Sequence, residues 1–335
     1  MRLRLQDGGF DARQKFLRRF VAGESEPNRQ EIHETTDQSF QLATGASRDN
    51  GAERTVSKLT DTQVRGSYTF GRDLAVATVL VNLPTGPSRA PAEDFSVLGA
   101  VSSSFLLFPV NSYGNGFSVT SGLAVAVPAG DWNLGLAGSV RVNSEYTPYV
   151  DANGPFTYNP GLEGRLRAGL DRLVGTSRLT LGLTYSTFGT DEFASGATVN
   201  GVYRPGKRWI AEGAIVAPIQ SGTITLAAWN YHRASGDSTG TPVGNRENLF
   251  SVGGAGTFRL AQSVDLVLAG DGRFLSPEQG SGTMGGGSIG LSIAAGRGVN
   301  FRPSVRYDLG TIKSGSGTSY SVRGVYLAAF LRGSF

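Results

Sequence analysis

The sequence predicts an all-β fold, a transmembrane antiparallel β-barrel of about 14 strands. Three observations support this prediction. Segments of roughly 10–14 residues alternate apolar and polar side chains from about residue 116 to the end of the chain. Short and long polar connections take turns between these segments. Apolar residues make up only 39% of the chain, and no run approaches the ~18 consecutive apolar residues that a membrane-spanning helix requires.

The alternation has the period of two that is typical of strands with two different faces. In the segment 117–127, Phe117, Val119 and Leu123 fall on one face, and Ser118 and Thr120 on the other. Segments this long exceed the ~5–6 residues of an average soluble strand and match the ~9–11 residues of a tilted membrane strand. A soluble sandwich or propeller is the competing interpretation. The same alternation recurs in segments 132–142, 162–173, 177–186, 207–218, 221–233, 247–259, 263–274, 284–295, 299–309 and 319–335.

The connections support a barrel with two unlike ends. Bacterial barrels have short periplasmic turns and longer outer loops. Counting back from Phe335 in the periplasm places every short turn on that side, provided that 197–206 is an outer loop. Two upstream segments, 64–70 and 73–83, predict a hairpin, and 39–47 a weak first strand. The count is then fourteen, with twelve as the alternative, and both termini are periplasmic. The short turns are 128–131, 173–176, 218–222, 260–263 and 295–298, and the long loops are 144–160, 188–206, 234–246, 275–283 and 311–318.

Two segments depart from the strand pattern. Residues 11–23 have apolar side chains at helical spacing, so we expect residues 1–36 to form an N-terminal segment separate from the barrel, which covers 37–335. Residues 92–110 are irregular and predict a helical loop element that folds over or into the barrel. The first residues carry positive charge without the apolar region of a signal peptide, so the numbering is expected to begin inside the mature chain.

Composition excludes several classes of site. The absence of cysteine excludes disulfides and thiolate sites, and two histidines exclude a multi-histidine metal centre. The net charge of +4 comes from arginines spread singly along strands, whereas nucleic-acid binding requires clustered cations. Acidic outer loops such as 149–159 and 235–245 match no defined calcium loop. We therefore expect no metal and no cofactor.

Aromatic side chains near the predicted strand ends suit the lipid–water interface, because one end of Trp or Tyr is apolar and the other polar. The predicted membrane-interface aromatics are Trp132, Trp209, Trp229, Tyr231 and Phe335.

The polar face carries charges along whole strands. Two interpretations remain open: an internal lattice of ion pairs that stiffens the barrel, or a charged constriction that orients passing solutes. Near 74–81 the polar alternation fades, so an apolar patch inside the barrel is also expected, facing either hydrophobic cargo or a plug. The predicted lumenal residues are Arg141, Glu163, Arg165, Arg167, Asp171, Arg178, Glu212, Asp265, Asp271, Arg273, Arg302, Arg306, Asp308 and Arg332.

His232 lies near Ser235, Asp237 and Ser238, residue types that a hydrolase at the outer rim would use. A hydrolase is therefore the last alternative. These residues are adjacent in sequence, and nothing fixes a nucleophile. An exposed polar histidine is the preferred interpretation, and the protein is expected not to be an enzyme.

The alternation and the terminal phenylalanine resemble bacterial outer-membrane β-barrels. Leu327, Leu331 and Phe335 match the alternate apolar positions of the C-terminal assembly signal of that class, and Gly333 departs from it. The segment VNLPTG (81–86) resembles transporters of the fatty-acid and aromatic-hydrocarbon group, which have about fourteen strands and an N-terminal hatch. The resemblance implies that residues 1–36 form a periplasmic or hatch-like segment, although the Asn-Pro-Ala hatch motif of that group is absent here. The resemblance implies outer-membrane location, with the lipid bilayer, lipopolysaccharide, the assembly machinery and a small solute as partners.

The expected function is passive or gated passage of small, hydrophobic molecules through the outer membrane. A general diffusion porin with mild anion preference is the first alternative, because arginines outnumber acids in the lumenal set. A structural or adhesion barrel whose outer loops bind a partner is the second.

Overall fold

The computed structural model describes residues 37–39, 42–49, 52–59, 61–70, 74–86, 89, 105, 114–151, 154–195, 198–244, 246–278, 280–294 and 299–333. Every regular element in these ranges is a β-strand. No helix there is long and apolar enough to span a membrane. The N-terminal segment 1–36, the turn 295–298 and Phe335 lie outside the described residues, so the predictions made for them stay predictions.

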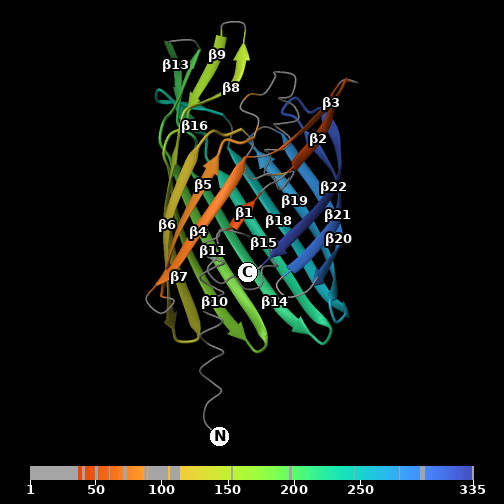
Figure 1. Ribbon diagram of the computed structural model, residues 1–335. Helices are drawn as coiled ribbons and strands as arrows, with labels where there is room; N and C mark the ends of the chain where they lie inside the picture. The colour runs from red at the N-terminus through yellow and green to blue at the C-terminus, as the bar shows by residue number, and fades with distance from the viewer. Residues whose placement is uncertain are drawn as a thin grey trace.

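Fourteen strands form one sheet that curls into a barrel (Figure 1). Each strand pairs antiparallel with its neighbours in the sheet. The predicted strand count is therefore confirmed. In order, the strands are β1 (Asp37–Ser39), β4 (Thr62–Phe70), β5 (Ala75–Leu83), β6 (Ser118–Ala129), β7 (Trp132–Asn143), β10 (Glu163–Val174), β11 (Ser177–Phe188), β14 (Arg208–Ile219), β15 (Gly222–Arg233), β18 (Glu247–Ala261), β19 (Val264–Pro277), β20 (Ser281–Ala294), β21 (Val299–Lys313) and β22 (Ser319–Gly333).

The first strand differs from the prediction. Only three residues of β1 pair with β4, and the following residues form a separate hairpin of β2 (Leu42–Asp49) and β3 (Ala52–Leu59). Figure 1 shows this hairpin at the same end of the molecule as the other long connections. The segment 39–47, expected as one spanning strand, is thus divided between the barrel and this hairpin.

One end of the barrel is closed by tight turns. The hairpins β6–β7 and β10–β11 reverse through two residues each, with Gly130 and Gly175 at φ +62°. The commonest two-residue hairpin turns use positive φ, which glycine adopts without steric cost. Two more tight turns, at 220–221 and 262–263, lie at the same end. This is the periplasmic end by the general rule for bacterial barrels. The last described residue of β22, Gly333, is paired there with Val299.

The opposite, outer end carries a second sheet. The strands β8 (Tyr146–Asp151), β9 (Gly154–Asn159), β12 (Asp191–Ser195) and β13 (Thr198–Tyr203) pair in the order β13-β12-β9-β8. A short hairpin, β16 (Gly236–Ser238) with β17 (Thr241–Val243), stands beside β13. Segment 197–206 therefore belongs to the outer region, as the strand count required, although it is a strand there and not an irregular loop.

Large apolar side chains cover the outward face of the barrel. Leu136, Leu166, Leu226 and Leu327 each have 60–73% of their surface exposed. Six of the barrel strands are 12 residues long, which corresponds to about 30 Å of height at a tilt of roughly 40°. That height equals the thickness of a bilayer's hydrocarbon core. The fold and this apolar belt are those of a bacterial outer-membrane β-barrel.

Replacing an outward leucine with arginine is expected to destabilise the barrel. The Leu226→Arg substitution places a charge in the middle of the apolar belt, which should reduce the free energy of unfolding by about 2–4 kcal/mol. The measurement is a urea titration in phospholipid vesicles. Ala227→Arg, one residue along and facing the interior, is the control and should cost much less. Equal losses in the two variants would contradict the assignment of faces.

Candidate solute path

The strand register defines which side chains face the interior of the barrel, here called the bore. Residues directly opposite one another on antiparallel strands share a face. The predicted lumenal charges from Arg141 to Asp308 all lie on the bore face by this criterion. Arg332 lies on β22 opposite Asn300. The charges from Arg141 to Asp308 therefore share one face of the sheet, and their role in a solute path stays a prediction.

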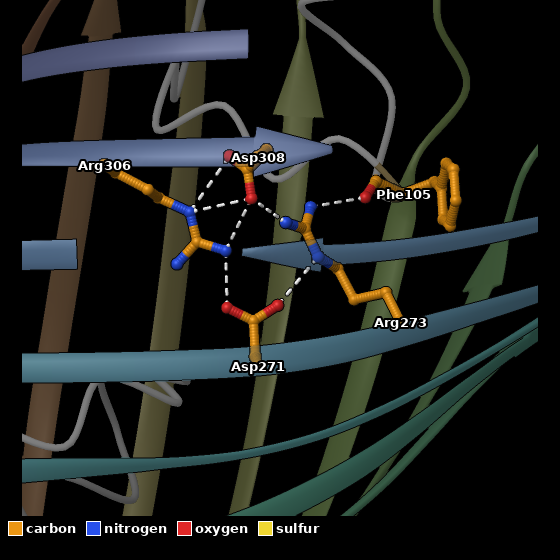
Figure 2. Close-up of polar contacts among 5 residues, drawn as sticks. All are labelled: Phe105, Asp271, Arg273, Arg306 and Asp308. Carbon is orange, nitrogen blue, oxygen red and sulfur yellow. Dashed lines mark hydrogen bonds and ion pairs between the residues drawn. The ribbon is translucent and has the colours of Figure 1, made fainter. Parts of the chain in front are cut away.

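Four of these charges form a compact ring on β19 and β21, here called the ion-pair ring: Asp271, Arg273, Arg306 and Asp308. Figure 2 shows the two arginines alternating with the two aspartates. Arg273 Nε lies 2.8 Å from Asp271 Oδ2, and Arg306 Nη2 lies 2.9 Å from Asp308 Oδ1. Arg273 also pairs with Asp308, and Arg306 with Asp271. The ring is electrically neutral, so it fits the structural interpretation of the lumenal charges.

Arg273 connects the ion-pair ring to a distant part of the chain. Its Nη1 donates to the backbone carbonyl of Phe105 at 2.6 Å, and its side chain is fully buried. Phe105 belongs to the segment 92–110, which is predicted to be a helical element that folds over or into the barrel. The rest of this segment lies outside the described residues, and Phe105 itself lies inside the barrel (Figure 2). Its ring packs with Leu249 and Met284 in a buried apolar cluster.

Gly286 provides the space that the ion-pair ring occupies. It lies on β20, directly between Asp271 on β19 and Asp308 on β21. A Cβ atom at this position would overlap Asp308 Oδ1 and the guanidinium of Arg306. The adjacent Gly287 faces outward, and the nearest atom to a Cβ there would be 3.8 Å away. The glycine at 286 is thus required by a close approach and not by a turn.

Further ion pairs brace the other side of the bore. Arg178 on β11 holds Asp171 on β10 through two hydrogen bonds of 2.5 and 3.0 Å, and Asp171 is only 2% exposed. Arg167 on β10 pairs with Glu212 on β14 across the intervening β11. Bidentate and cross-strand pairs of this kind leave little unpaired charge.

A row of bore-facing residues that includes three arginines runs along the barrel wall near its outer end. Arg165, Ser186, Arg208, Arg233 and Glu247 lie directly opposite one another on five consecutive strands, β10, β11, β14, β15 and β18. We call Arg165, Arg208 and Arg233 the arginine row.

Two members of the arginine row, Arg165 and Arg233, are in contact with water. Although their side chains face the bore, Arg165 is 49% and Arg233 41% exposed. Arg165 pairs with Glu163 at 2.8 Å and Arg233 with Glu247 at 3.0 Å, and the Arg208 guanidinium lies over the Phe188 ring at 4.4 Å. This part of the bore differs from the ion-pair ring, because its charges remain available to a solute.

Sequence reasoning missed Arg208 and Arg233, since both stand at strand ends beside predicted loops. Their parity was an available signal. Arg208 shares a face with Glu212, and Arg233 shares a face with Thr225, which is buried on the bore side.

Two of the predicted interface aromatics face outward. Trp132 lies near the periplasmic end, where Arg172 approaches its ring at 5.4 Å. Trp209 is 44% exposed and lies against Tyr185, with a centroid separation of 4.4 Å.

The prediction for Trp229 and Tyr231 is wrong. Both lie on the bore face of β15 and pack against the Phe105, Leu249 and Met284 cluster. The reason is the strand parity: Leu226 points into the lipid, so residues 229 and 231 point inward. The inserted Phe105 supplies the apolar surroundings that these two rings would otherwise have found at the interface.

Asp61 is a third residue that sequence reasoning missed. Its carboxylate is buried at the outer rim and accepts hydrogen bonds from Gly86 N at 3.0 Å, Asn115 N at 3.1 Å and Asn82 Nδ2 at 3.2 Å. Gly86 and Asn115 stand at the two ends of the connection that carries Phe105. Asp61 therefore fastens both ends of this connection to the barrel rim.

His232 lies on the outward face of β15, opposite Trp209 and Asn248. Its sequence neighbours serve the backbone: Asp237 accepts from Gly240 N at 2.9 Å, and Ser238 donates to the Val202 carbonyl at 2.8 Å. These contacts do not assemble a nucleophile and base. Within the described ranges, no three His, Asp or Glu residues lie close enough to hold a metal ion.

The outer sheet is held to the barrel by a buried carboxylate. Asp191 accepts hydrogen bonds from the Tyr158 hydroxyl and, at 2.7 Å, from Gly161 N. Burial, and then the hydrogen bond to Asp191 and its charge, raise the pKa of Tyr158. Burial raises the pKa of Tyr146 as well. Both phenols are therefore held in their neutral form.

Gly286→Ala is expected to lower the stability of the barrel, because the added methyl displaces charged side chains of the ion-pair ring. Overpacking of this kind costs about 1–3 kcal/mol. The measurement is the free energy of unfolding in lipid vesicles. Gly287→Ala on the same strand is the matched control and should be neutral or slightly stabilising. A loss in the control as large as in Gly286→Ala would argue against the crowding explanation.

The outer sheet is expected to loosen at alkaline pH. The folded pKa of Tyr158 lies above its ordinary value of about 10, so its contribution to stability is complete below that value and declines as pH rises further. Limited proteolysis of the outer sheet between about pH 8 and 12 measures the effect. Tyr158→Phe removes this group and should flatten the pH profile, whereas Tyr307→Phe on the outward face should not. Identical profiles for all three proteins would refute the prediction.

No family model matches the sequence, and no curated protein matches it. Among solved structures, the fold is similar to the outer-membrane-expressed OmpT of Vibrio cholerae, with 12% identity over 90% of this chain and 99% of that chain and a TM-score of 0.45. It is similar to CdiB from Escherichia coli, with 12% identity, coverage of 95% of this chain and 63% of that chain, and a TM-score of 0.49. It is also similar to the outer membrane channel DcaP of Acinetobacter baumannii, with 12% identity, coverage of 89% of this chain and 94% of that chain, and a TM-score of 0.45. At such low identity the likeness concerns strand arrangement and not function.

Proposed function

We propose that the protein is an outer-membrane channel for small solutes that prefers anions and carries out no bond chemistry. The observation that carries this proposal is the arginine row, which lies on the bore face and in which the side chains of Arg165 and Arg233 remain exposed to water. Of the functions considered from the sequence, this is the diffusion porin with anion preference.

The charge balance at the outer mouth supports anion preference. Among the described residues on that side, positive charges exceed negative ones: the arginines are Arg65, Arg141 and the three members of the arginine row, and the acids are Asp61, Glu163 and Glu247. Cations that line a channel with low-dielectric walls raise the local concentration of anions and lower the barrier to their entry.

The deeper charges support a different role. In the ion-pair ring and the Asp171–Arg178 pair, Arg273 and Asp171 are buried, their partners are largely covered, and the charges neutralise one another. They stiffen the wall and hold the Phe105 segment, while the arginine row is left to meet the solute.

Hydrophobic cargo, the first expectation from the sequence, has weaker support. The apolar patch expected near 74–81 exists as a cluster of Val76, Ala124 and Ala126, with Ala137 packed against it. This cluster is buried, as are Phe105, Leu249 and Met284. Buried apolar surface is already covered and offers a solute no contact.

The anion preference is expected to disappear when the arginine row is neutralised. In a planar bilayer with a KCl gradient, the reversal potential of the native protein should indicate chloride permeability greater than that of potassium. The Arg165→Gln/Arg208→Gln/Arg233→Gln variant should lose at least half of this ratio, because the excess positive charge is removed.

Arg172→Gln is the control, since Arg172 lies on the outward face near the periplasmic turns. A native protein that conducts without preferring chloride would overturn the proposed anion preference. A silent native protein would instead favour the structural or adhesion barrel.

A further inference from the structure

We infer that this channel binds small planar aromatic carboxylates, of which benzoate is the simplest, at its outer mouth. The inference rests on the proposed channel function and names a solute class for it. Its basis is the juxtaposition of a sheet of aromatic rings with the arginine row.

Six aromatic side chains share one face of the outer sheet, here called the aromatic face. Register places Tyr149 opposite Phe156, and Tyr158 opposite both Tyr146 and Phe193. Phe156 and Tyr158 are two positions apart on β9, so both pairs lie on the same face of the sheet. The members of the aromatic face are Tyr146, Tyr149, Phe156, Tyr158, Phe193 and Tyr203.

The rings of the aromatic face form a stack and not a scattered set. Tyr149 and Phe156 are nearly parallel, with centroids 4.6 Å apart and an interplanar angle of 9°. Phe193 continues the stack 6.1 Å from Phe156, at 22°. Gly201 lies beneath the Phe193 ring, where a Cβ atom would overlap it. Planar molecules bind to such stacks by offset stacking of their own rings.

The aromatic face is turned toward the mouth of the barrel. Its members are half-buried, whereas Val150, Pro155 and Glu192 on the opposite face of the sheet are exposed. Tyr146 packs against Gly116, at the outer end of the bore wall, and is influenced by the charge of Arg141 on the bore face. The exposed side of the sheet is therefore its outer surface.

The aromatic face stands directly beyond the arginine row. β8, β9, β12 and β13 continue the barrel strands β7, β10, β11 and β14, which include the strands that carry Arg165 and Arg208. At the junction, Gly161 and Gly189 approach so closely that a Cβ on either would overlap the other segment. Phe188 adds a ring beside the arginine row, because its ring centroid lies 4.4 Å from the guanidinium carbon of Arg208. Below the row, Tyr231 and Trp229 continue the aromatic lining.

These two surfaces select for two properties in one molecule. Guanidinium groups bind carboxylates through paired N–H donors, and the aromatic face offers ring surfaces for stacking. An aliphatic acid meets only the arginines, and a neutral aromatic molecule meets only the rings. An aromatic carboxylate meets both surfaces as it enters.

The test compares benzoate with cyclohexanecarboxylate, which has the same charge and a similar size but no flat ring. In planar bilayers containing the full chain, benzoate should block chloride current at a concentration about 5–10-fold lower, as expected from two aromatic contacts. The Tyr149→Leu/Phe156→Leu/Phe193→Leu variant should lose this difference while keeping its anion preference. Phe250→Leu/Phe274→Leu, a stacked pair on the outward face, is the matched control.

A second readout separates this inference from the proposed function. Saturation-transfer NMR of the refolded protein should show contact between protein and benzoate ring protons, and the triple leucine variant should lose it. Anion preference without discrimination between the two acids would overturn the inference and leave the channel intact. Benzoate contact in a protein that does not conduct would overturn the channel and leave the binding site. Absence of both would overturn both.

Discussion

Backbone hydrogen bonding in a medium without water is the constraint on which the rest of this structure depends. In the hydrocarbon of a bilayer, each N–H and C=O group must find its partner within the protein. Fourteen antiparallel strands meet this requirement by pairing with one another. Once the backbone is committed to this arrangement, every side chain has only two places to go, the lipid or the bore. The leucines exposed on the outward face and the buried Arg273 on the bore face are two results of the same alternation.

The bore side of the sheet carries charges that would be costly if they were unpaired. The structure meets this cost locally, by placing opposite charges on neighbouring or next-neighbouring strands and by removing side chains between them. The ion-pair ring spans β19 and β21 only because Gly286 on β20 leaves room for it. Arg273 then anchors Phe105, whose connection is fastened at both ends by Asp61. Phe105 is thus bonded to the barrel wall.

The outer mouth is built on a different principle. Arg165 and Arg233 keep contact with water, and four strands, β7, β10, β11 and β14, extend beyond the barrel into a sheet of stacked rings. The same four strands therefore produce a rigid wall within the membrane and a surface of mixed aromatic and cationic character above it. Where the barrel strands pass into the outer sheet, Gly161 and Gly189 allow the β9–β10 and β11–β12 connections to approach each other closely.

The sequence by itself determined the fold class, the strand number, the positions of the tight turns and the face of most charged residues, because period-two alternation is a local property of the chain. It also carried the parity of Trp229 and Tyr231, but the usual preference of these rings for the interface led to the wrong face. Only the tertiary structure decided which charges meet. The arginine row depends on the register of five strands, the ion-pair ring on a glycine between two others, and the aromatic face on hairpins that pair above the barrel. Register and loop insertion join residues far apart in sequence, and no local pattern records them.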